Sequence, residues 1–209
     1  MTTTYLNDES FFSIIWMCGH VEPVLSQIER WSDDNIAKFR FIHDAEMKEK
    51  WFTLDQIQNF YPGIKTIAVV HNPWERTVFL YEKLKYHMTQ NEPYLADVKN
   101  ETFEEFVGNI HVSLNNSENW PHWFNLSTAQ TTWTERTLPD GTIQQADYII
   151  KIENLVEDFQ PLADYFCKPA PDFIHSYDPI DYRSYYNDST KQIIADLFKT
   201  DIERFGYTF

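Results

Sequence analysis

The stretch from residue 65 to residue 88, KTIAVVHNPWERTVFLYEKLKYHM, constrains the fold more than any other part of the sequence. Its first part, Thr66–Val70, is a short apolar run rich in β-branched residues, which is typical of a central strand in a parallel sheet. Asn72 and Pro73 suit the cap and the first turn of a helix, and Glu75 stands at the capping-box position. We therefore predict a buried strand, a sharp turn and a helix.

The predicted helix also suggests a ligand. Its buried face is expected to contain, at helical spacing, Trp74, Val78, Tyr81, Leu84 or the stem of Lys85, and Met88. Free backbone N–H groups and the helix dipole favour an anion at the start of such a helix. Residues 71–76 are thus a candidate site for a phosphate-type ligand. An ordinary, well-capped joint between a strand and a helix explains the same residues, and the local sequence alone favours that interpretation.

Composition predicts a globular protein with one substantial core. The chain has 209 residues, of which 43 % are hydrophobic and 17 % aromatic, and we expect a single domain over residues 1–209. The five glycines are too few for a Gly-rich phosphate loop. The sequence has no apolar run of membrane-spanning length and its polar first residues do not resemble a signal peptide, so we expect a cytoplasmic location. Cys18 and Cys167 are expected to be buried thiols and not metal ligands.

The charge limits the partners. A formal net charge of −15 disfavours nucleic acid, anionic membranes and highly sulfated polymers, since each would meet a repulsive field. It does not exclude a small anion in a local pocket. The sequence gives no indication of the oligomeric state.

The first part of the chain alternates strands and helices. Residues 11–17 and 38–42 are predicted strands, the second ending at His43, and residues 21–31 and 53–60 are predicted helices. The helix at 53–60 begins with a predicted capping box, Thr53 to Gln56, and is expected to bury Leu54, Ile57 and Phe60. With the strand at 66–70, this order predicts a parallel sheet. The turn at residues 18–20 has one glycine and no lysine, so it is not a Walker A loop.

The second part is predicted as a mixture of helices, strands and a long loop. A capping box, Thr102 to Glu105, begins a short helix with an apolar face, and residues 111–128, with His122, are predicted to be an excursion over a ligand site. The remaining predictions are a turn at 138–141, a strand at 147–152, helices at 153–159 and 161–166, and a loop at 168–182 with His175. A last helix, 189–205, should bury Ile193, Ile194, Leu197, Phe198, Ile202 and Phe205 before Gly206 ends it.

Three blocks in the same order resemble the carbohydrate-type sulfotransferases, which use 3′-phosphoadenosine 5′-phosphosulfate (PAPS). They are VVHNPWERTVFLY at residues 69–81, ADYIIKIENLVEDF at residues 146–159, and DYRSYYNDSTKQIIADLFKTDIERFGYTF at residues 181–209. Gln130 and Trp133 also stand where relatives commonly have a Gln followed by an aromatic residue or Leu. The resemblance covers nearly the whole chain.

The resemblance implies a fold, a reaction and a set of residues. The fold would be α/β, a central parallel sheet flanked by helices in one domain, related to the P-loop NTPases. The reaction would be transfer of a sulfuryl group from PAPS to a hydroxyl of a saccharide or small metabolite, without a metal. The residues implied as PAPS-binding are Cys18, Gly19, His20, Val21, His71, Asn72 and Arg76, with Arg76 alternatively a scaffold residue. The catalytic candidates are His43 as the base, Glu22 as the second choice, and His20 as a donor to the bridging oxygen in place of the family Lys.

The departures from the family pattern leave two main hypotheses open. The family turn that cradles the 5′-phosphosulfate carries a Lys, whereas here the turn at residues 16–22 has none and ends with Glu22. The family positions for an Arg and a Ser that hold the 3′-phosphate are occupied by His71 and Phe79. The chain is therefore either an active sulfotransferase with a divergent donor site or a catalytically degenerate binding or interaction protein. A third possibility is a pocket for another nucleotide or anion.

Overall fold

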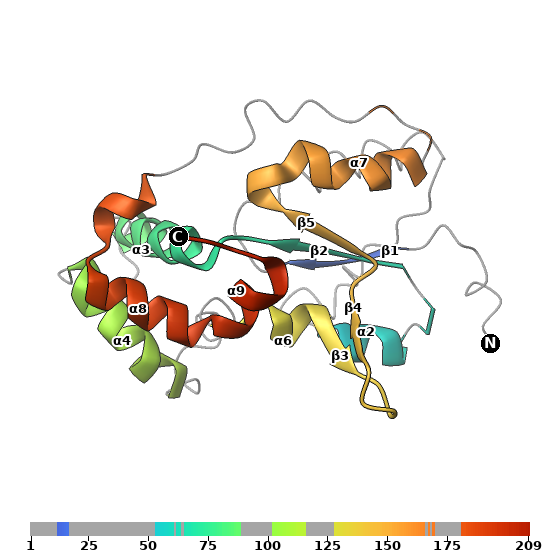
Figure 1. The fold of residues 1–209 in the computed structure, drawn as a ribbon, viewed down its shortest axis with the longest axis horizontal. Coiled ribbons are helices and arrows are strands. Elements are labelled where there is room, and N and C mark those ends of the chain that lie inside the picture. Colours follow the sequence, from blue (N-terminus) through green and yellow to red (C-terminus); the bar gives the residue numbers. More distant parts are fainter. Residues whose placement is uncertain are drawn as a thin grey trace. The chain divides into compact units, whose positions relative to one another are not determined.

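The computed structural model describes residues 12–16, 53–60, 62–63, 65–88, 102–115, 128–165, 167, 169 and 181–209 (Figure 1). The chain divides into two compact units, each built from two separate segments. Unit 1 comprises residues 1–70 and 130–178, and unit 2 comprises residues 71–129 and 179–209. The single domain over residues 1–209 stays a prediction.

Among its described residues, unit 1 contains a three-stranded parallel sheet in the order β1 (Phe12–Trp16), β2 (Lys65–Val70), β5 (Tyr148–Lys151). Every residue of β2 after Lys65 is buried, as its apolar sequence predicts for a central strand. Ile67 is in register with Ile14 of β1 and with Tyr148 of β5. The predicted parallel sheet and the α/β class are thus confirmed.

Helices cover both faces of this sheet. Figure 1 shows α7 (Leu155–Tyr165) on one face and α2 (Leu54–Phe60) and α6 (Thr131–Thr134) on the other. Ala68 of β2 packs in a buried cluster with the residues Leu54, Ile57, Trp133 and Ala146. A 3₁₀ turn, η3 (Ile152–Asn154), joins β5 to α7. Pro161, which was expected to start or kink a second helix, lies inside the continuous α7.

A hairpin completes unit 1. β3 (Glu135–Thr137) pairs antiparallel with β4 (Ile143–Gln145), and the predicted turn lies between them. The N–H of Thr142 donates to Asp140 Oδ1 over 2.9 Å. Gly141 has a φ of +84°, in the left-handed region that glycine adopts without strain.

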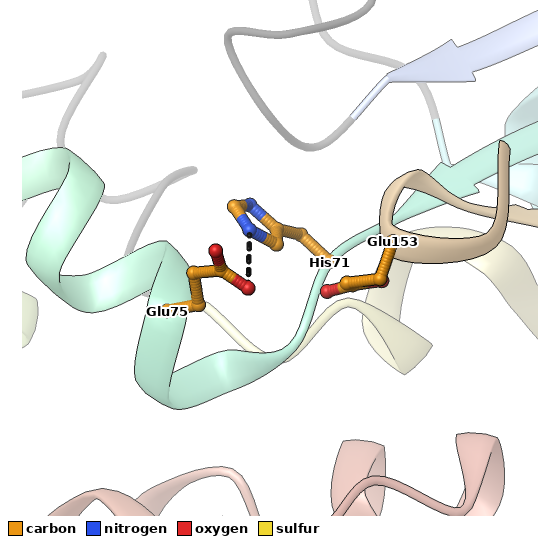
Figure 2. A group of neighbouring side chains, drawn as sticks. All are labelled: His71, Glu75 and Glu153. Atoms are coloured by element: carbon orange, nitrogen blue, oxygen red, sulfur yellow. Dashed lines mark ion pairs between the residues drawn. The ribbon is translucent and has the colours of Figure 1, made fainter. Parts of the chain in front are cut away.

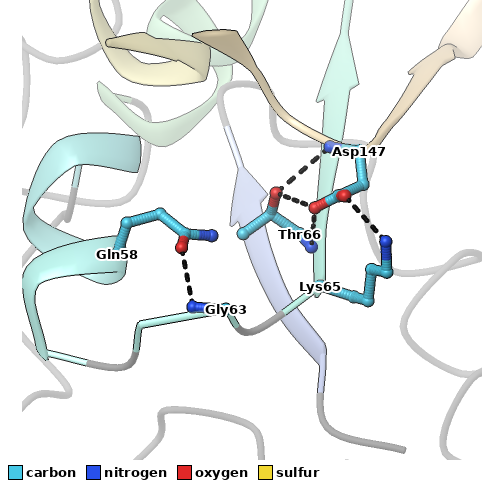
Figure 3. Close-up of polar contacts among 5 residues, drawn as sticks. All are labelled: Gln58, Gly63, Lys65, Thr66 and Asp147. Carbon is cyan, nitrogen blue, oxygen red and sulfur yellow. Dashed lines mark hydrogen bonds and ion pairs between the residues drawn. The ribbon is translucent and has the colours of Figure 1, made fainter. Parts of the chain in front are cut away.

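Asp147 links the starting ends of β2 and β5 (Figure 3). Its Oδ2 accepts from the N–H and from the hydroxyl of Thr66, each over 2.9 Å, and its own N–H donates to Thr66 Oγ1. Lys65 Nζ lies 3.2 Å from Oδ1, and this hydrogen bond and charge raise the pKa of Lys65. Thr66 is fully buried, so the carboxylate satisfies polar groups that water does not reach.

Removal of the Asp147 side chain should destabilise the protein more than removal of the Lys65 charge. We expect Asp147→Ala to lower the free energy of unfolding by about 1–3 kcal/mol, because it leaves buried donors of Thr66 without an acceptor. Lys65→Met should cost less than about 1 kcal/mol, because that ion pair is partly exposed. Urea denaturation of both variants measures the difference, and equal losses would contradict this assignment.

Unit 2 is helical in its described residues. It contains α3 (Pro73–Met88), α4 (Phe103–Asn115), the 3₁₀ turn η4 (Tyr182–Tyr185), α8 (Asp188–Leu197) and α9 (Lys199–Phe205). Its core is rich in aromatic rings: Tyr81 of α3 contacts Phe103 and Phe106 of α4, both at 5.3 Å between ring centroids. Trp74, Val78 and Tyr81 are buried along α3, as predicted.

Two of the predicted capping boxes form, those that begin at Thr53 and at Thr102. The N–H of Thr53 donates to Gln56 Oε1 over 2.9 Å, and the N–H of Thr102 donates to Glu105 Oε2 over 2.7 Å. The reciprocal bonds run from the N–H of Gln56 and of Glu105 to the threonine hydroxyls. The apolar face predicted for α4 is buried, namely Phe103, Phe106, Val107 and Ile110.

Two predicted helix faces are wrong in detail. Phe60 is 62 % exposed. On a helix of 3.6 residues per turn, each step of three residues turns the side-chain direction back by about 60°. Phe60 lies two such steps after Leu54, so it points away from the face of Leu54. Ile193 is 37 % exposed because it lies about 100° around α8 from the buried Ile194. The predicted last helix is in fact two helices, since Phe198 has φ −108° and ψ 27° between α8 and α9. Gly206 ends α9 with a φ of +68°, as predicted.

Cys167 is exposed and not buried as predicted, because it lies in a turn after α7 with its N–H bonded to the carbonyl of Asp164. Residues 111–115 belong to α4, so the predicted excursion is helical at its start. Cys18, the helix predicted at 21–31, the strand at 38–42 and residues 116–127 lie outside the described residues. In the part of the chain that the structure describes, no helix is both long and apolar enough to cross a membrane.

Candidate functional site at the start of helix α3

The predicted joint between β2 and α3 forms as the sequence indicates. β2 ends at Val70 and α3 begins at Pro73, so that His71 and Asn72 alone connect them. Asn72 Oδ1 accepts from the N–H of Trp74 over 3.1 Å, and the backbone carbonyl of Asn72 accepts from the N–H of Arg76 over 2.8 Å. These bonds satisfy donors that a helix start otherwise leaves open.

A buried histidine and a buried carboxylate lie side by side at this joint (Figure 2). Nε2 of His71 is 3.7 Å from Oε2 of Glu75, which lies in the first turn of α3. The His71 side chain is 0 % and the Glu75 side chain 6 % exposed. Phe79 lies one helical turn after Glu75, and its ring centroid is 6.5 Å from that of the His71 imidazole. A carboxylate near a helix N-terminus is favoured by the helix dipole, so Glu75 provides locally the negative charge that this end of α3 attracts.

His71 and Glu75 are residues of types that can bind a metal ion. Imidazole nitrogens and carboxylate oxygens are donor types that divalent metals bind, and each of these two residues offers one such atom. The absence of a metal at this site therefore stays a prediction.

Arg76 contacts groups of the protein itself. Its Nη2 donates to the backbone carbonyl of Thr128 over 3.2 Å, and its guanidinium carbon lies 4.7 Å from the centroid of the Phe198 ring. The residue is buried. These contacts are those of the scaffold residue that the sequence left open as an alternative to a ligand contact.

The segment after α9 meets the same joint. Asn72 Nδ2 donates to the backbone carbonyl of Thr208 over 3.1 Å, and the rings of Trp74 and Phe209 meet edge-to-face at 5.7 Å. The indole N–H of Trp74 donates to the carbonyl of Lys191, and the hydroxyl of Tyr186 donates to the carbonyl of Trp74. Burial raises the pKa of Tyr186, so this hydroxyl keeps its proton and remains a donor at neutral pH.

The structure places three of the predicted PAPS-binding residues together, namely His71, Asn72 and Arg76. The other predicted site residues lie outside the described residues: Cys18, Gly19, His20, Val21, Glu22 and His43, with the loop residues His122 and His175. Gln130 and Trp133, which entered through the resemblance, are buried beside and in the short helix α6 of unit 1.

The partners of the joint were not predictable from the capping pattern alone. The spacing of four between His71 and Glu75 is the one sequence signal that indicates their contact. No sequence signal indicates that Thr208, 136 residues away, meets Asn72. Comparison with family models, with curated proteins and with solved structures gives no significant match.

Asn72→Ala should destabilise unit 2 more than Asn72→Ser. Alanine removes the cap on Trp74 and the donor to Thr208, whereas serine keeps a cap, so we expect losses of about 2 kcal/mol and about 1 kcal/mol in the free energy of unfolding. Urea denaturation gives both values. A loss of only a few tenths of a kcal/mol in the alanine variant would contradict the importance of this side chain.

Proposed function

We propose that this chain is a sulfotransferase-like α/β protein that acts as a binding or interaction module and does not transfer a sulfuryl group. The observation that carries the proposal is the buried Glu75 carboxylate, 3.7 Å from His71, in the first turn of α3. The resemblance assigns this turn to the 3′-phosphate of PAPS, held by an Arg and a Ser at the positions of His71 and Phe79. In this chain, the turn contains a negative charge of its own.

The charge of Glu75 opposes a phosphate at the same turn. Two like unit charges 4 Å apart repel by about 4 kcal/mol at an effective dielectric constant of about 20. Such a penalty corresponds to about a thousandfold loss in affinity, because each 1.4 kcal/mol is a factor of about ten. In an intact donor site, the Arg at position 71 would instead attract the phosphate.

The remaining polar side chains of the turn support the same proposal. The carboxamide of Asn72 bonds to the N–H of Trp74 and to the carbonyl of Thr208, and the guanidinium of Arg76 bonds to the carbonyl of Thr128. A phosphate would have to compete with these internal partners. The part of the family motif that supports the scaffold is therefore retained, whereas the part that binds the ligand is altered.

A second candidate function is PAPS-dependent sulfuryl transfer to a hydroxyl of a saccharide or small metabolite. It is favoured by one observation: only two residues separate the carboxyl end of the central strand β2 from the start of α3, a helix of 16 residues. Ligands of parallel α/β sheets bind at this edge, and anions bind at such helix starts. In this case His43 or Glu22 would accept the proton of the attacking hydroxyl, and His20 would donate to the bridging oxygen that leaves.

Binding of the donor product separates the two candidates. We expect millimolar 3′,5′-ADP to leave the melting temperature of the wild-type protein unchanged, because the ligand stabilises only a protein that binds it. Differential scanning fluorimetry over a concentration series measures the shift. A rise that saturates with 3′,5′-ADP would contradict the proposal and favour the sulfotransferase, and assays with PAPS and saccharide acceptors would then follow.

The variant Glu75→Gln tests whether the carboxylate excludes the phosphate. We expect it to bind 3′,5′-ADP at least about tenfold more tightly than the wild type, because the repulsion is removed and most of the side-chain volume is kept. Glu104→Gln is the matched control, since it removes one charge from the first turn of α4, where the side chain is exposed. Isothermal titration calorimetry compares the two. Equal affinities would show that Glu75 is not what excludes the ligand.

A further inference from the structure

The chain reverses direction after α9 and returns toward α3. Gly206 adopts the left-handed conformation, and the N–H groups of Gly206 and Tyr207 both donate to the carbonyl of Ile202. Closure of the helix in this way needs a residue with positive φ, which glycine supplies without strain. Tyr207, which follows, is buried and packs against the ring of Phe205. The next two residues, 208–209, are here named the latch segment.

Phe209 lies among rings and cations of unit 2. Its ring meets those of Trp74, Tyr182 and Tyr186 edge-to-face, at centroid distances of 5.5–5.7 Å and interplanar angles of 83–89°. The ammonium group of Lys191 lies 4.0 Å from the ring centroid, a cation–π distance. Edge-to-face pairs and cation–π contacts are directional, so they fix the position of the ring as well as its burial.

The latch segment also fixes Asn72. The carbonyl of Thr208 accepts from Asn72 Nδ2, and Oδ1 of the same carboxamide caps the N–H of Trp74. The carboxamide is planar, so a bond at Nδ2 also fixes the direction of Oδ1. The orientation of the α3 cap therefore depends on a residue in the latch segment.

We infer that the latch segment is a conformational device that holds the first turn of α3, and that this turn opens locally when the latch segment leaves. The segment is suited to leave by itself because Thr208 is exposed, Phe209 is only partly buried, and no helix or strand includes them. Local openings of this kind cost less than unfolding of the helices. His71 precedes Asn72 and Glu75 follows Trp74 in the chain. Departure of the latch segment would therefore also let the side chains of His71 and Glu75 move.

Amide hydrogen exchange of the full chain tests this inference. The amides of Trp74 and Arg76 are the probes, because they donate to Asn72 Oδ1 and to the Asn72 carbonyl. We expect Phe209→Ala to accelerate their exchange by about tenfold or more and to leave the amides of β2 unchanged. Thr208→Ala is the matched control, since Thr208 contacts Asn72 through its backbone and its exposed side chain can be removed without loss of that bond.

Two results would overturn the inference. One is unchanged exchange at Trp74 and Arg76 in Phe209→Ala; the other is equal acceleration throughout α3, α4 and α8, which would report general destabilisation of unit 2. If the alanine variant does not fold, Phe209→Leu decides, because it keeps an apolar side chain and loses the ring contacts. This test contains no nucleotide, so its outcome is independent of whether the joint binds 3′,5′-ADP.

Discussion

Unit 2 depends on the carboxamide of Asn72. A buried amide has donors and acceptors that must all be satisfied within the protein, and here its two ends are bonded to the start of α3 and to the segment after α9. The backbone carbonyl of the same residue accepts the first bond of the helix, from Arg76. A hydrocarbon side chain at this position would keep that backbone bond but would leave the start of α3 and the segment after α9 without their common partner.

The joint between β2 and α3 is of a kind that attracts anions, and in this chain an acidic side chain lies there. In such a joint the helix start attracts a negative group, which is either a ligand or a side chain. Here Glu75 is that group, and His71 is beside it. Asn72 and Pro73 end the turn and begin the helix in either case, so the same backbone serves a bound anion or an acidic side chain.

Local features were predictable from the sequence, and distant partners were not. The capping boxes at Thr53 and Thr102, the turn at 138–141 and the burial of Trp74, Val78 and Tyr81 each depend on residues within a few positions, and these predictions were confirmed. The break at Phe198 was missed because apolar residues continue through it with a helical period. Cys167 was predicted from its residue type alone, although the turn after α7 decides its exposure. At the candidate site, the cap was predictable, but the contacts of Thr208, Thr128 and Phe198 come from elsewhere in the chain.

The chain passes between the two units three times, after residues 70, 129 and 178. Neither unit is therefore a continuous piece of sequence, and this matters during synthesis. β2 can pair with β1 early, but its other neighbour, β5, is made about 80 residues later. The side chain of Asn72 gains its partner later still, because the carbonyl of Thr208 lies 136 residues further along the chain. During synthesis on the ribosome, the Nδ2 group of Asn72 must therefore stay hydrated until Thr208 has emerged.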